Sequence, residues 1–458
     1  MVHSINDFKR PFFVGIAGAG MSAIAQYLNG IGMEVSGSDR FFNTGEAGDI
    51  KAKLEGEGVN CFAQNGQGIT PSNDLIVVSA AVEDSVVEVQ KAKELSIPII
   101  KRSELLALIA ASKKTIAVGG TSGKSTTCAM LFDILEHAGL QPSVISGAGL
   151  VSIIKKGRIG NSKVGNGEWL IIEADESDGS IVQYKPEIGL LLNIEKDHKE
   201  LNILMDVFRV FRQNSKKFIV NGSHIGSRKF SQDKKYDFAF DDSSVGGYVA
   251  TAFNQEGLKI SFKINNTPFH LNLVGRHNME NALAATAVAA QLDVPLQTCA
   301  DALANYEGIY RRNQVLGCKD GVWVIDDFAH NPVKCAAAIL SCQPIAPKVV
   351  AWFQPHGYGP TKFLRQDFVE EIGNVLRDQD EIWMSEIFYA GGTTVKDISA
   401  NDLINDLRAN NKKAFFVEDR NDLLKAIRSH LTANCVLLLM GARDPSLEKF
   451  SRKTWEDL

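Results

Sequence analysis

The sequence lacks the long apolar segments that mark membrane proteins and secreted precursors. Its longest apolar runs, such as Ile188–Leu192 and Val436–Met440, are far too short to cross a bilayer. The amino-terminal segment Met1–Arg10 is polar and has no apolar core of the kind found in signal peptides. We therefore expect a protein that works in the cytoplasm and has no membrane partner.

The sequence also lacks an excess of charge of either sign. It has 49 Lys and Arg residues against 54 Asp and Glu residues, so its net charge is −5, and it has neither a basic tail nor an acidic block. Surfaces that bind nucleic acid are usually strongly basic. The charge balance therefore argues against nucleic acid as the main partner.

Cysteine is sparse and shows no pairing pattern. The seven cysteines include no C-x-x-C pair and lie mostly within apolar stretches. Such residues are typically buried, reduced thiols, which agrees with a cytoplasmic location.

The sequence does have a long alternation of strand-like and helical segments. At 458 residues the chain is too long for one hydrophobic core, and its 45% apolar and 22% charged residues are ordinary for a globular protein. Strands that alternate with helices favour parallel sheets. The alternation restarts twice, so we predict an α/β protein with three domains, residues 1–108, 109–312 and 313–458.

The first domain opens with a glycine-rich turn. A strand over Phe12–Ala17 is followed by Gly18-Ala19-Gly20-Met21-Ser22-Ala23, a helix, and a strand over Glu34–Ser38 that leads to Asp39. A strand, the pattern G-x-G-x-x-A and an acid about 20 residues later are typical of a turn that binds nucleotide phosphates. Further elements of the alternation are predicted over Asp74–Ser79, Val86–Leu95 and Ile97–Lys101.

The second domain opens with Ile116–Met130, which carries another phosphate-binding pattern. An apolar strand runs into Gly120-Thr121-Ser122-Gly123-Lys124-Ser125-Thr126 and then into a helix. Glycines let backbone N–H groups gather around an anion, Lys124 adds a positive charge, and Ser125 or Thr126 offers a hydroxyl for Mg²⁺. The spacing G-x-x-G-K-S is two residues shorter than the general P-loop pattern. A glycine-rich turn with a surface lysine is therefore the simpler alternative to a triphosphate site.

Polar clusters follow the next two predicted strands of this domain. Trp169–Glu173 leads to Asp175, and Ile188–Ile194 leads to a segment that contains His198. The carboxyl ends of parallel strands share one edge of a sheet, so Glu173 and His198 are candidate ligands of Mg²⁺. A solvated acid and a structural histidine are the alternatives.

The later part of this domain is predicted to hold a smaller sheet over 221–270 and then an alanine-rich helix. At the start of that helix, Asn278 and Asn281 either bind a purine or cap the helix. Arg311 and Arg312 lie at the predicted boundary, either as linker charges or as a clamp for phosphate.

The third domain repeats the alternation, and polar clusters again follow its strands. Asp326 and Asp327 end one predicted strand and precede His330, while His356 follows the next strand. Ligands of parallel sheets bind at this carboxyl edge. Strands are predicted over Gly321–Ile325, Val349–Phe353, Glu381–Ser385, Ala414–Val417 and Cys435–Met440.

Together these motifs resemble those of the Mur ligase family, the ATP-dependent amide-forming enzymes of peptidoglycan synthesis. Each motif alone is a weak signal, but they occur in the family's order over essentially the whole chain. They are G-I-A-G-A-G-M-S at 15–22, S-G-S-D at 36–39, V-V-S-A-A-V at 77–82, G-T-S-G-K-S-T-T at 120–127, E-A-D-E-S-D at 173–178, N-I-E-K-D-H at 193–198, G-R-H-N-x-x-N at 275–281, Y-R-R at 310–312, D-D-F-A-H-N-P at 326–332 and Q-P-H at 354–356.

The resemblance implies a Rossmann-like amino-terminal domain, a central P-loop ATPase domain and a Rossmann-like carboxyl-terminal domain that binds an amino acid. It implies that ATP phosphorylates a muramoyl carboxylate and that an amine then displaces phosphate from the acyl phosphate. The implied partners are a UDP-linked muramoyl substrate and an amino acid, with ATP and Mg²⁺ as cofactors and a monomer or weak homodimer as the assembly. Within the family, the motifs are most like those of members that add L-alanine.

The resemblance also implies roles for individual residues. Contact with the UDP-linked substrate is implied for Gly18, Gly20, Met21, Ser22 and Asp39. Contact with ATP is implied for Gly120, Thr121, Ser122, Gly123, Lys124, Ser125, Thr126, Asn281, Arg312, Asp326 and Asp327. Ligation of Mg²⁺ is implied for Ser125, Glu173 and His198. Catalysis is implied for Lys124, Glu173, His198 and His330, and contact with the reacting groups for His330 and His356.

The sequence departs from the family pattern in the P-loop and after the third-domain acids. Ser122 replaces a histidine, and Asn331 replaces the second of two histidines. Ser125 replaces a threonine but keeps the hydroxyl, so we expect Mg²⁺ binding to survive.

Larger departures concern the acceptor of the new bond. Gly357-Tyr358-Gly359-Pro360-Thr361 stands where arginines usually hold a carboxylate or acyl phosphate, and Lys362 or Arg365 is the expected substitute. Arg443 stands where glycine is usual, and we expect it either to narrow the site or to contact a carboxylate.

Three alternatives stay open on the sequence alone. One is a family member with a different acceptor, such as the ligase that recycles a whole tripeptide, and the region 356–362 and Arg443 are the features that discriminate it. Another is an NAD-dependent dehydrogenase, which residues 15–39 suggest but which leaves the P-loop unexplained. The third is a non-catalytic nucleotide-binding module, which Lys124, Glu173 and His198 argue against.

Overall fold

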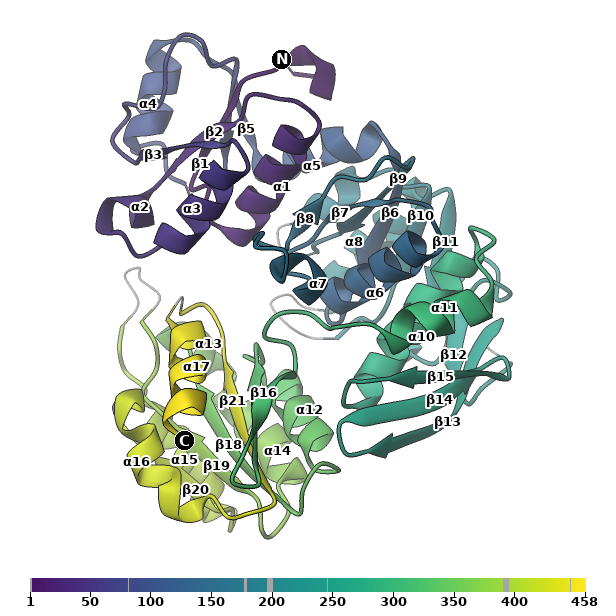
Figure 1. Ribbon diagram of the computed structural model, residues 1–458, viewed down its shortest axis with the longest axis vertical. Coiled ribbons are helices and arrows are strands. Elements are labelled where there is room, and N and C mark those ends of the chain that lie inside the picture. The colour runs from purple at the N-terminus through teal and green to yellow at the C-terminus, as the bar shows by residue number, and fades with distance from the viewer. Residues whose placement is uncertain are drawn as a thin grey trace. The chain divides into compact units, whose positions relative to one another are not determined.

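The structure, a computed structural model, contains three larger sheets and one smaller sheet in two compact units (Figure 1). The described residues are 2–80, 82–176, 179–195, 201–244, 246–389, 395–444 and 446–458. The first unit comprises Met1–Thr251, Lys263–Phe269 and Glu280–Ile309. The second unit comprises Ala252–Phe262, His270–Met279 and Tyr310–Leu458. Helices alternate with mainly parallel strands in both, which confirms the predicted α/β class.

The amino-terminal sheet has five parallel strands in the order β3-β2-β1-β4-β5. The chain leaves the central strand β1 (Pro11–Val14) toward β2 on one side and returns on the other side as β4. The carboxyl end of β1 is therefore the topological switch point, where open α/β sheets bind ligands. The other strands are β2 (Ser36–Asp39), β3 (Asn60–Ala63), β4 (Leu75–Val78) and β5 (Ile99–Lys101).

The elements of this sheet follow the predicted pattern except at β3. The sequence did not predict β3 because its four residues are only partly buried or exposed and form no apolar run. The predicted glycine-rich turn leads into the first long helix, and Gly18 is the N-cap of that helix. The helical segments are η1 (Ile5–Asp7), α1 (Ala19–Gly30), α2 (Arg40–Thr44), α3 (Gly48–Gly56), α4 (Val87–Glu94) and α5 (Arg102–Ala111).

The central sheet has six strands in the order β11-β10-β6-β9-β7-β8. β6 (Lys114–Gly119), which leads into the predicted P-loop, lies between β9 (Trp169–Glu173) and β10 (Ile188–Leu191), and all three run parallel. The segments that follow these three strands therefore share one edge of the sheet. The remaining strands are β7 (Ser143–Ile145), β8 (Ser162–Lys163) and β11 (Lys217–Val220), of which β8 is antiparallel to β7.

Helices and a small sheet complete this middle part of the chain. The predicted small sheet is present, with four strands in the order β12-β13-β14-β15. Its strands are β12 (Phe238–Phe240), β13 (Tyr248–Glu256), β14 (Lys259–Ile264) and β15 (Thr267–Leu271). The helical segments are α6 (Lys124–His137), α7 (Val151–Ile154), η2 (Ser180–Gln183), α8 (Leu201–Asn214), α9 (Ile225–Arg228), α10 (Arg276–Ala290) and α11 (Leu296–Ala304).

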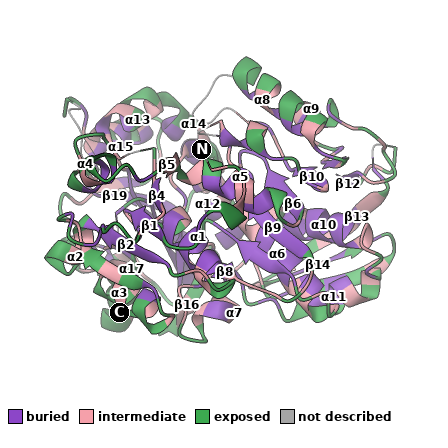
Figure 2. Ribbon diagram, turned by 90° about the horizontal axis from the view of Figure 1, so that it is seen from above, coloured by how far each residue is buried: buried purple, intermediate pink, exposed green. Residues whose placement is uncertain are grey.

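A single hydrophobic cluster runs through both larger sheets of the first unit. It includes Phe13 and Ile24 from the amino-terminal part and Ile172, Phe208 and Phe211 from the central part, all fully buried. Figure 2 shows β6, β9 and α6 as largely buried. Burying one large apolar side chain stabilises a fold by roughly 1.5–3 kcal/mol. The shared cluster therefore holds the two predicted phosphate-binding turns in one packed body.

The second unit contains a six-stranded sheet in the order β16-β17-β21-β18-β19-β20. The last strand of the chain is inserted between β17 and β18, parallel to both. β16, an antiparallel edge strand, was not predicted, because its residues are mostly exposed or half-buried and show no apolar run. The strands are β16 (Gln314–Lys319), β17 (Val322–Asp327), β18 (Lys348–Gln354), β19 (Glu381–Met384), β20 (Ala414–Phe416) and β21 (Cys435–Gly441).

Helices surround this third sheet, and its core is separate from that of the first unit. Their bounds are α12 (Pro332–Cys342), α13 (Tyr358–Phe363), α14 (Arg365–Val375), α15 (Ala400–Ala409), η3 (Arg420–Asp422), α16 (Leu423–Ile427), η4 (Arg428–His430) and α17 (Leu447–Asp457).

Two expectations from composition can be compared with the structure. Across the described ranges, no helix has both the length and the hydropathy that a bilayer crossing needs. The seven cysteines are free thiols, and five of them are buried, whereas Cys61 is half-buried and Cys318 is exposed.

Candidate active site

The predicted P-loop forms a tight turn between β6 and α6. Gly123, the N-cap of α6, has φ +85°, a left-handed conformation that favours glycine. A Cβ atom at this position would lie 2.5 Å from Oδ1 of Asn281, so only glycine fits without movement. The N-cap makes no side-chain hydrogen bond, and Ser125 and Thr126 are half-buried in the first turn of the helix. Free backbone N–H groups at the start of a 14-residue helix fit a phosphate group.

Asn193, just beyond β10, fixes the shape of the loop. Its Oδ1 accepts hydrogen bonds from the hydroxyl of Thr121 at 2.9 Å and the backbone N–H of Ser122 at 2.8 Å. Its Nδ2 donates to the carbonyl oxygen of Ser122 at 3.1 Å. One amide side chain thus holds two consecutive loop residues from the neighbouring strand.

Lys124 lies across the loop and is paired with an acid. Its Nζ donates to the carbonyl oxygen of Gly120 and to Oε2 of Glu176, both at 2.7 Å. Both side chains are largely buried, with 17% and 6% of their surfaces exposed. Burial alone would lower the pKa of Lys124, but Glu176, Asp175 and Glu173 outweigh it and raise the pKa. The ammonium group is therefore charged at neutral pH.

Glu173, at the end of β9, is held in one orientation. Its Oε1 accepts hydrogen bonds from the hydroxyl of Ser146 at 2.7 Å and the backbone N–H of Gly147 at 2.6 Å. Its Oε2 accepts no hydrogen bond from any described residue, which leaves one oriented oxygen that fits a hard cation. The other expected ligand, His198, lies outside the described residues. Among the residues that the structure does describe, no cluster of three His, Cys, Asp or Glu side chains forms a metal site.

Asn281 is buried on α10 and lies beside the P-loop. Its Oδ1 accepts a hydrogen bond from the hydroxyl of Thr127 at 3.3 Å, one turn into α6. Asn278, by contrast, donates to the carbonyl oxygen of Val274 at 2.7 Å, within its own segment. Of the two asparagines predicted to bind a purine or cap a helix, only Asn281 is described in contact with the P-loop segment.

The amino-terminal turn is organised by the acid predicted to lie near its ligand. Asp39, which ends β2 and is 5% exposed, accepts hydrogen bonds from the backbone N–H groups of Ala17 and Phe41, both at 3.0 Å. It therefore fixes the glycine-rich turn and caps α2. A Cβ atom on Gly20 would lie 3.2 Å from Cδ of Arg102, so this cationic side chain lies against the turn.

A buried amide connects this turn to the central sheet. Asn161, beside β8, donates to the carbonyl oxygen of Ala19 at 2.8 Å and to the hydroxyl of Ser22 at 3.0 Å. It also accepts a hydrogen bond at 2.7 Å from Nε2 of Gln26. Ser22 and Met21, both predicted substrate contacts, are buried in the described structure.

In the second unit, the two boundary arginines take different roles. Arg311 is buried and donates to both oxygens of Asp326, at 2.8 and 3.1 Å, and to the carbonyl oxygen of Gly441 at 3.1 Å. The guanidinium of Arg312 lies over the ring of Phe328, 4.9 Å from its centroid. The paired arginine is thus not the one that the sequence assigned to phosphate.

Asp327 is also engaged inside the fold. Its two oxygens accept hydrogen bonds from the backbone N–H groups of Asn313, at 2.6 Å, and Ala329, at 2.7 Å. Both acids implied to contact ATP, Asp326 and Asp327, therefore have internal partners, and these partners fix the segment between β17 and α12.

His330 and His356 come together at the carboxyl edge of the third sheet. Their ring centroids are 5.7 Å apart. Nδ1 of His330 lies 2.9 Å from the carbonyl oxygen of Phe328, and because a carbonyl only accepts, Nδ1 carries the hydrogen and Nε2 has the lone pair. Burial, aided by the charges of Lys334 and Arg312, lowers the pKa of His330 to about 3. The ring is therefore neutral at physiological pH.

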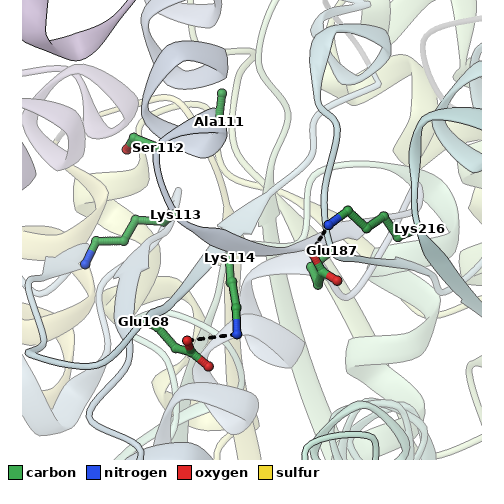
Figure 3. A pocket seen from close by; sticks show the side chains of 7 residues that line it. All are labelled: Ala111, Ser112, Lys113, Lys114, Glu168, Glu187 and Lys216. Atoms are coloured by element: carbon green, nitrogen blue, oxygen red, sulfur yellow. Dashed lines mark hydrogen bonds and ion pairs between the residues drawn. The ribbon is translucent and has the colours of Figure 1, made fainter.

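One cavity among the described residues lies away from the P-loop. It is lined by residues at the amino-terminal ends of β6, β9, β10 and β11, the edge of the sheet opposite the P-loop. Figure 3 shows two ion pairs there, Lys114 with Glu168 at 2.8 Å and Lys216 with Glu187 at 2.7 Å. These paired surface charges leave no group oriented for catalysis.

Sequence reasoning missed four residues that shape the two turns. Asn193 and Glu176 belong to motifs that had been noted, and their position after strands next to β6 was the available signal. Asn161 and Arg102 lie in segments without a motif, so only the folded chain brings them to the turns.

Comparison with protein families gives three matches along the chain. Residues 12–114 match the Mur ligase family catalytic domain, 118–289 match the Mur ligase middle domain, and 311–443 match the Mur ligase glutamate ligase domain. The matches follow one another without overlap and confirm the three-domain architecture. The predicted boundaries at 108 and 312 stay predictions.

Individual proteins are similar to this chain over nearly its whole length. A UDP-N-acetylmuramate–L-alanine ligase of Trichlorobacter lovleyi is 32% identical over 455 residues, covering 95% of this chain and 96% of that protein. One of Myxococcus xanthus is 31% identical, covering 94% and 92%. The crystal structure of UDP-N-acetylmuramate-alanine ligase from Thermotoga maritima superposes with a TM-score of 0.79 at 25% identity over 98% of each chain. A murein peptide ligase of Psychrobacter arcticus, 21% identical with a TM-score of 0.68 over 98% of each chain, shares the fold.

Proposed function

The chain belongs to the Mur ligase family, and on that basis we propose that it is an ATP-dependent ligase that joins UDP-N-acetylmuramate to L-alanine. The amide forms between the muramoyl carboxylate and the amine of the amino acid, through an acyl phosphate. This is a step of peptidoglycan synthesis. The proposal is supported by curated relatives of that name that match over more than nine-tenths of both chains.

The observation that carries the catalytic part is the arrangement at the end of β6. A charged lysine, an open helix N-terminus and a serine hydroxyl lie at the start of α6, which follows β6, and an oriented carboxylate oxygen lies at the end of the adjacent parallel strand β9. When bound, ATP supplies the phosphoryl group, and Mg²⁺ neutralises its charge. Ser125 and Glu173, together with His198, are the proposed ligands of that ion.

Lys124 and the backbone N–H groups of the loop bind the phosphates and orient them. Lys124 gives up its bond to Glu176 or shares its ammonium group between that acid and the phosphates, since an ammonium has three donors. Asn193 keeps the loop in shape while this happens. Positioning and electrostatic stabilisation of this kind supply most of the rate in phosphoryl transfer.

His330 is proposed to act on the amine. Its neutral ring presents a lone pair on Nε2, which accepts a hydrogen bond from the N–H of the attacking amine and holds it toward the acyl phosphate. His356, 5.7 Å away between ring centroids, lines the same place. We propose that the reaction takes place in the cytoplasm and that the enzyme is a monomer or a weak homodimer.

The test is phosphate release from ATP and Mg²⁺ in the presence of UDP-N-acetylmuramate. L-alanine, glycine, L-serine and the muropeptide tripeptide are compared as acceptors. We expect L-alanine to give the highest kcat/KM, and the product is identified by its mass. Turnover with the tripeptide alone would replace the proposal with the recycling ligase, and no turnover with any amine would refute both.

A further inference from the structure

Arg443 follows the strand at the centre of the third sheet. In the register of that sheet, Gln354 is paired with Gly441, and Asp327 is paired with Met440. The segments after β17 and β18 thus flank the end of β21, and their His330 and His356 rings approach to 5.7 Å. Arg443, two residues past β21, begins its side chain at the same carboxyl edge as these histidines.

The backbone of Arg443 has a conformation that is uncommon for its residue type. Its φ of +64° lies in the left-handed region, which favours glycine. A side chain kept in such a conformation points to a role for that side chain.

The neighbours of Arg443 hold this conformation. Arg420 forms an ion pair with the buried Asp444 and donates to the hydroxyl of Ser446 at 2.5 Å. The backbone N–H of Ser446 donates to Asp444 at 2.8 Å. Arg420 also donates to Oε1 of Gln354 at 2.8 Å, so one guanidinium connects the segment that follows Arg443 to the end of β18, two residues before His356.

Arg443 is an exposed residue, and its side chain makes no hydrogen bond or ion pair with any described residue. The two cations that the sequence offered as substitutes for the missing arginines are already engaged. Lys362 pairs with Asp397 at 2.5 Å, and Arg365 forms a bidentate pair with Asp406 at 2.7 and 3.0 Å. Of these three cations, Arg443 is the one whose side-chain N–H donors form no hydrogen bond with any described residue.

We propose that Arg443 binds the carboxylate of the amino acid whose amine is joined, and so selects acceptors with a free α-carboxylate. The inference rests on the proposed ligase function. A planar guanidinium matches a carboxylate with two parallel hydrogen bonds. It holds the amino acid by its unreactive end, at the edge where His330 faces the amine.

The experiment compares the wild-type enzyme with Arg443→Gly and Arg443→Lys, using L-alanine and L-alaninamide as acceptors. For Arg443→Gly we expect KM for L-alanine to rise on the order of 10- to 100-fold, while KM for ATP and for UDP-N-acetylmuramate changes by less than about twofold. The preference for L-alanine over L-alaninamide should collapse. Arg443→Lys keeps the positive charge but cannot form two parallel hydrogen bonds. It should restore part of the affinity for L-alanine and part of the preference over L-alaninamide.

The controls separate recognition from folding. Glycine suits a φ of +64°, so Arg443→Gly should unfold at a temperature no lower than wild type. Arg452→Met removes an exposed arginine of α17 in the same unit and should leave every KM unchanged.

Three results would overturn the inference. One is an unchanged KM for L-alanine in Arg443→Gly, and another is an equal loss with L-alaninamide. The third is a rise confined to KM for ATP or for the UDP-linked substrate, which would assign Arg443 to phosphate. If wild type itself fails to turn over L-alanine, the ligase proposal fails first, and this is seen before any variant is measured.

Discussion

The P-loop edge of the central sheet and the carboxyl edge of the third sheet are built in different ways. At the P-loop, main-chain groups are proposed to contact the ligand, and side chains such as Asn193 hold the main chain in place. At the third sheet, the groups proposed to contact the ligand are the side chains of His330, His356 and Arg443. The first arrangement tolerates little change, whereas the second can change its acceptor by replacing a few side chains.

This difference agrees with where the sequence departs from its family. The P-loop departs at Ser122 and Ser125, but it keeps Gly123 and Lys124, and Ser125 preserves the hydroxyl. The segment after Gln354-Pro355-His356 lacks the usual arginines, and a new arginine stands at 443. The four variants below test the contrast, beginning with the largest expected effect.

Lys124→Ala should reduce ATP turnover on the order of 1,000-fold, because it removes the one side-chain cation shown in the loop. Binding of UDP-N-acetylmuramate should persist, since that ligand is proposed to occupy the amino-terminal turn. Phosphate release and calorimetric titration measure the two effects separately. Joint loss of both would contradict the division of work between the two turns.

Gly123→Ala should lower kcat/KM for ATP about 100-fold, because its Cβ would meet Asn281 at 2.5 Å and displace the loop. Gly139→Ala is the matched control. Gly139 also has a left-handed backbone, with φ +77°, but a Cβ there meets no atom within 4 Å. Steady-state kinetics should be normal for the control, and equal defects in both variants would show that backbone strain, not the loop shape, was responsible.

Arg420→Met should raise KM for L-alanine about tenfold and leave KM for ATP unchanged, because Arg443 loses its fixed neighbours. Stability should fall by about 3 kcal/mol, since Asp444 stays buried without its partner. Arg377→Met is the control, because it strips the buried Asp380 of its arginine at the opposite end of the sheet. Urea unfolding should report similar losses for both, with KM altered only in Arg420→Met.

His330→Gln should change how stability depends on pH. Burial lowers the pKa of His330 to about 3, so the unfolded chain binds this proton more readily and wild type loses stability as pH falls below about 6.5. Between pH 6.5 and 4.5 the histidine accounts for a loss on the order of 2 kcal/mol, which the glutamine variant should not show. Thermal unfolding at several pH values measures the difference, and identical slopes would place the neutral ring in doubt.

The α/β class and most strands could be predicted from the sequence, because buried parallel strands such as β1 and β21 are runs of apolar residues. β3 and β16 could not, since the residues of these edge strands are exposed or half-buried and form no apolar run. The starts of α1 and α6 could also be predicted, because a glycine-rich turn precedes each helix.

The local geometry around a candidate site could be predicted where a motif fixes it, whereas the contacts with ATP stay predictions. The P-loop glycine, lysine and serine belong to such a motif. The roles of side chains that form ion pairs within the fold could not be predicted from a motif. Arg311 and Arg312 are adjacent and chemically identical, and only the fold shows which one is buried against Asp326. Likewise, the spacing of Lys362 and Arg365 gave no sign that both were already paired.

The side chain of Asn161 limits how far the amino-terminal sheet can be treated as an independent module. It is buried against the first turns of α1 and satisfies groups on Ala19, Ser22 and Gln26. A fragment that ended at residue 108 would lack Asn161 and would expose its hydrogen-bond partners on α1 to water. If a foreign amino-terminal domain were joined to the central domain, the amide of Asn161 would be buried without these partners. Exchange of substrate-binding domains between family members therefore requires that the two halves of the first unit change together.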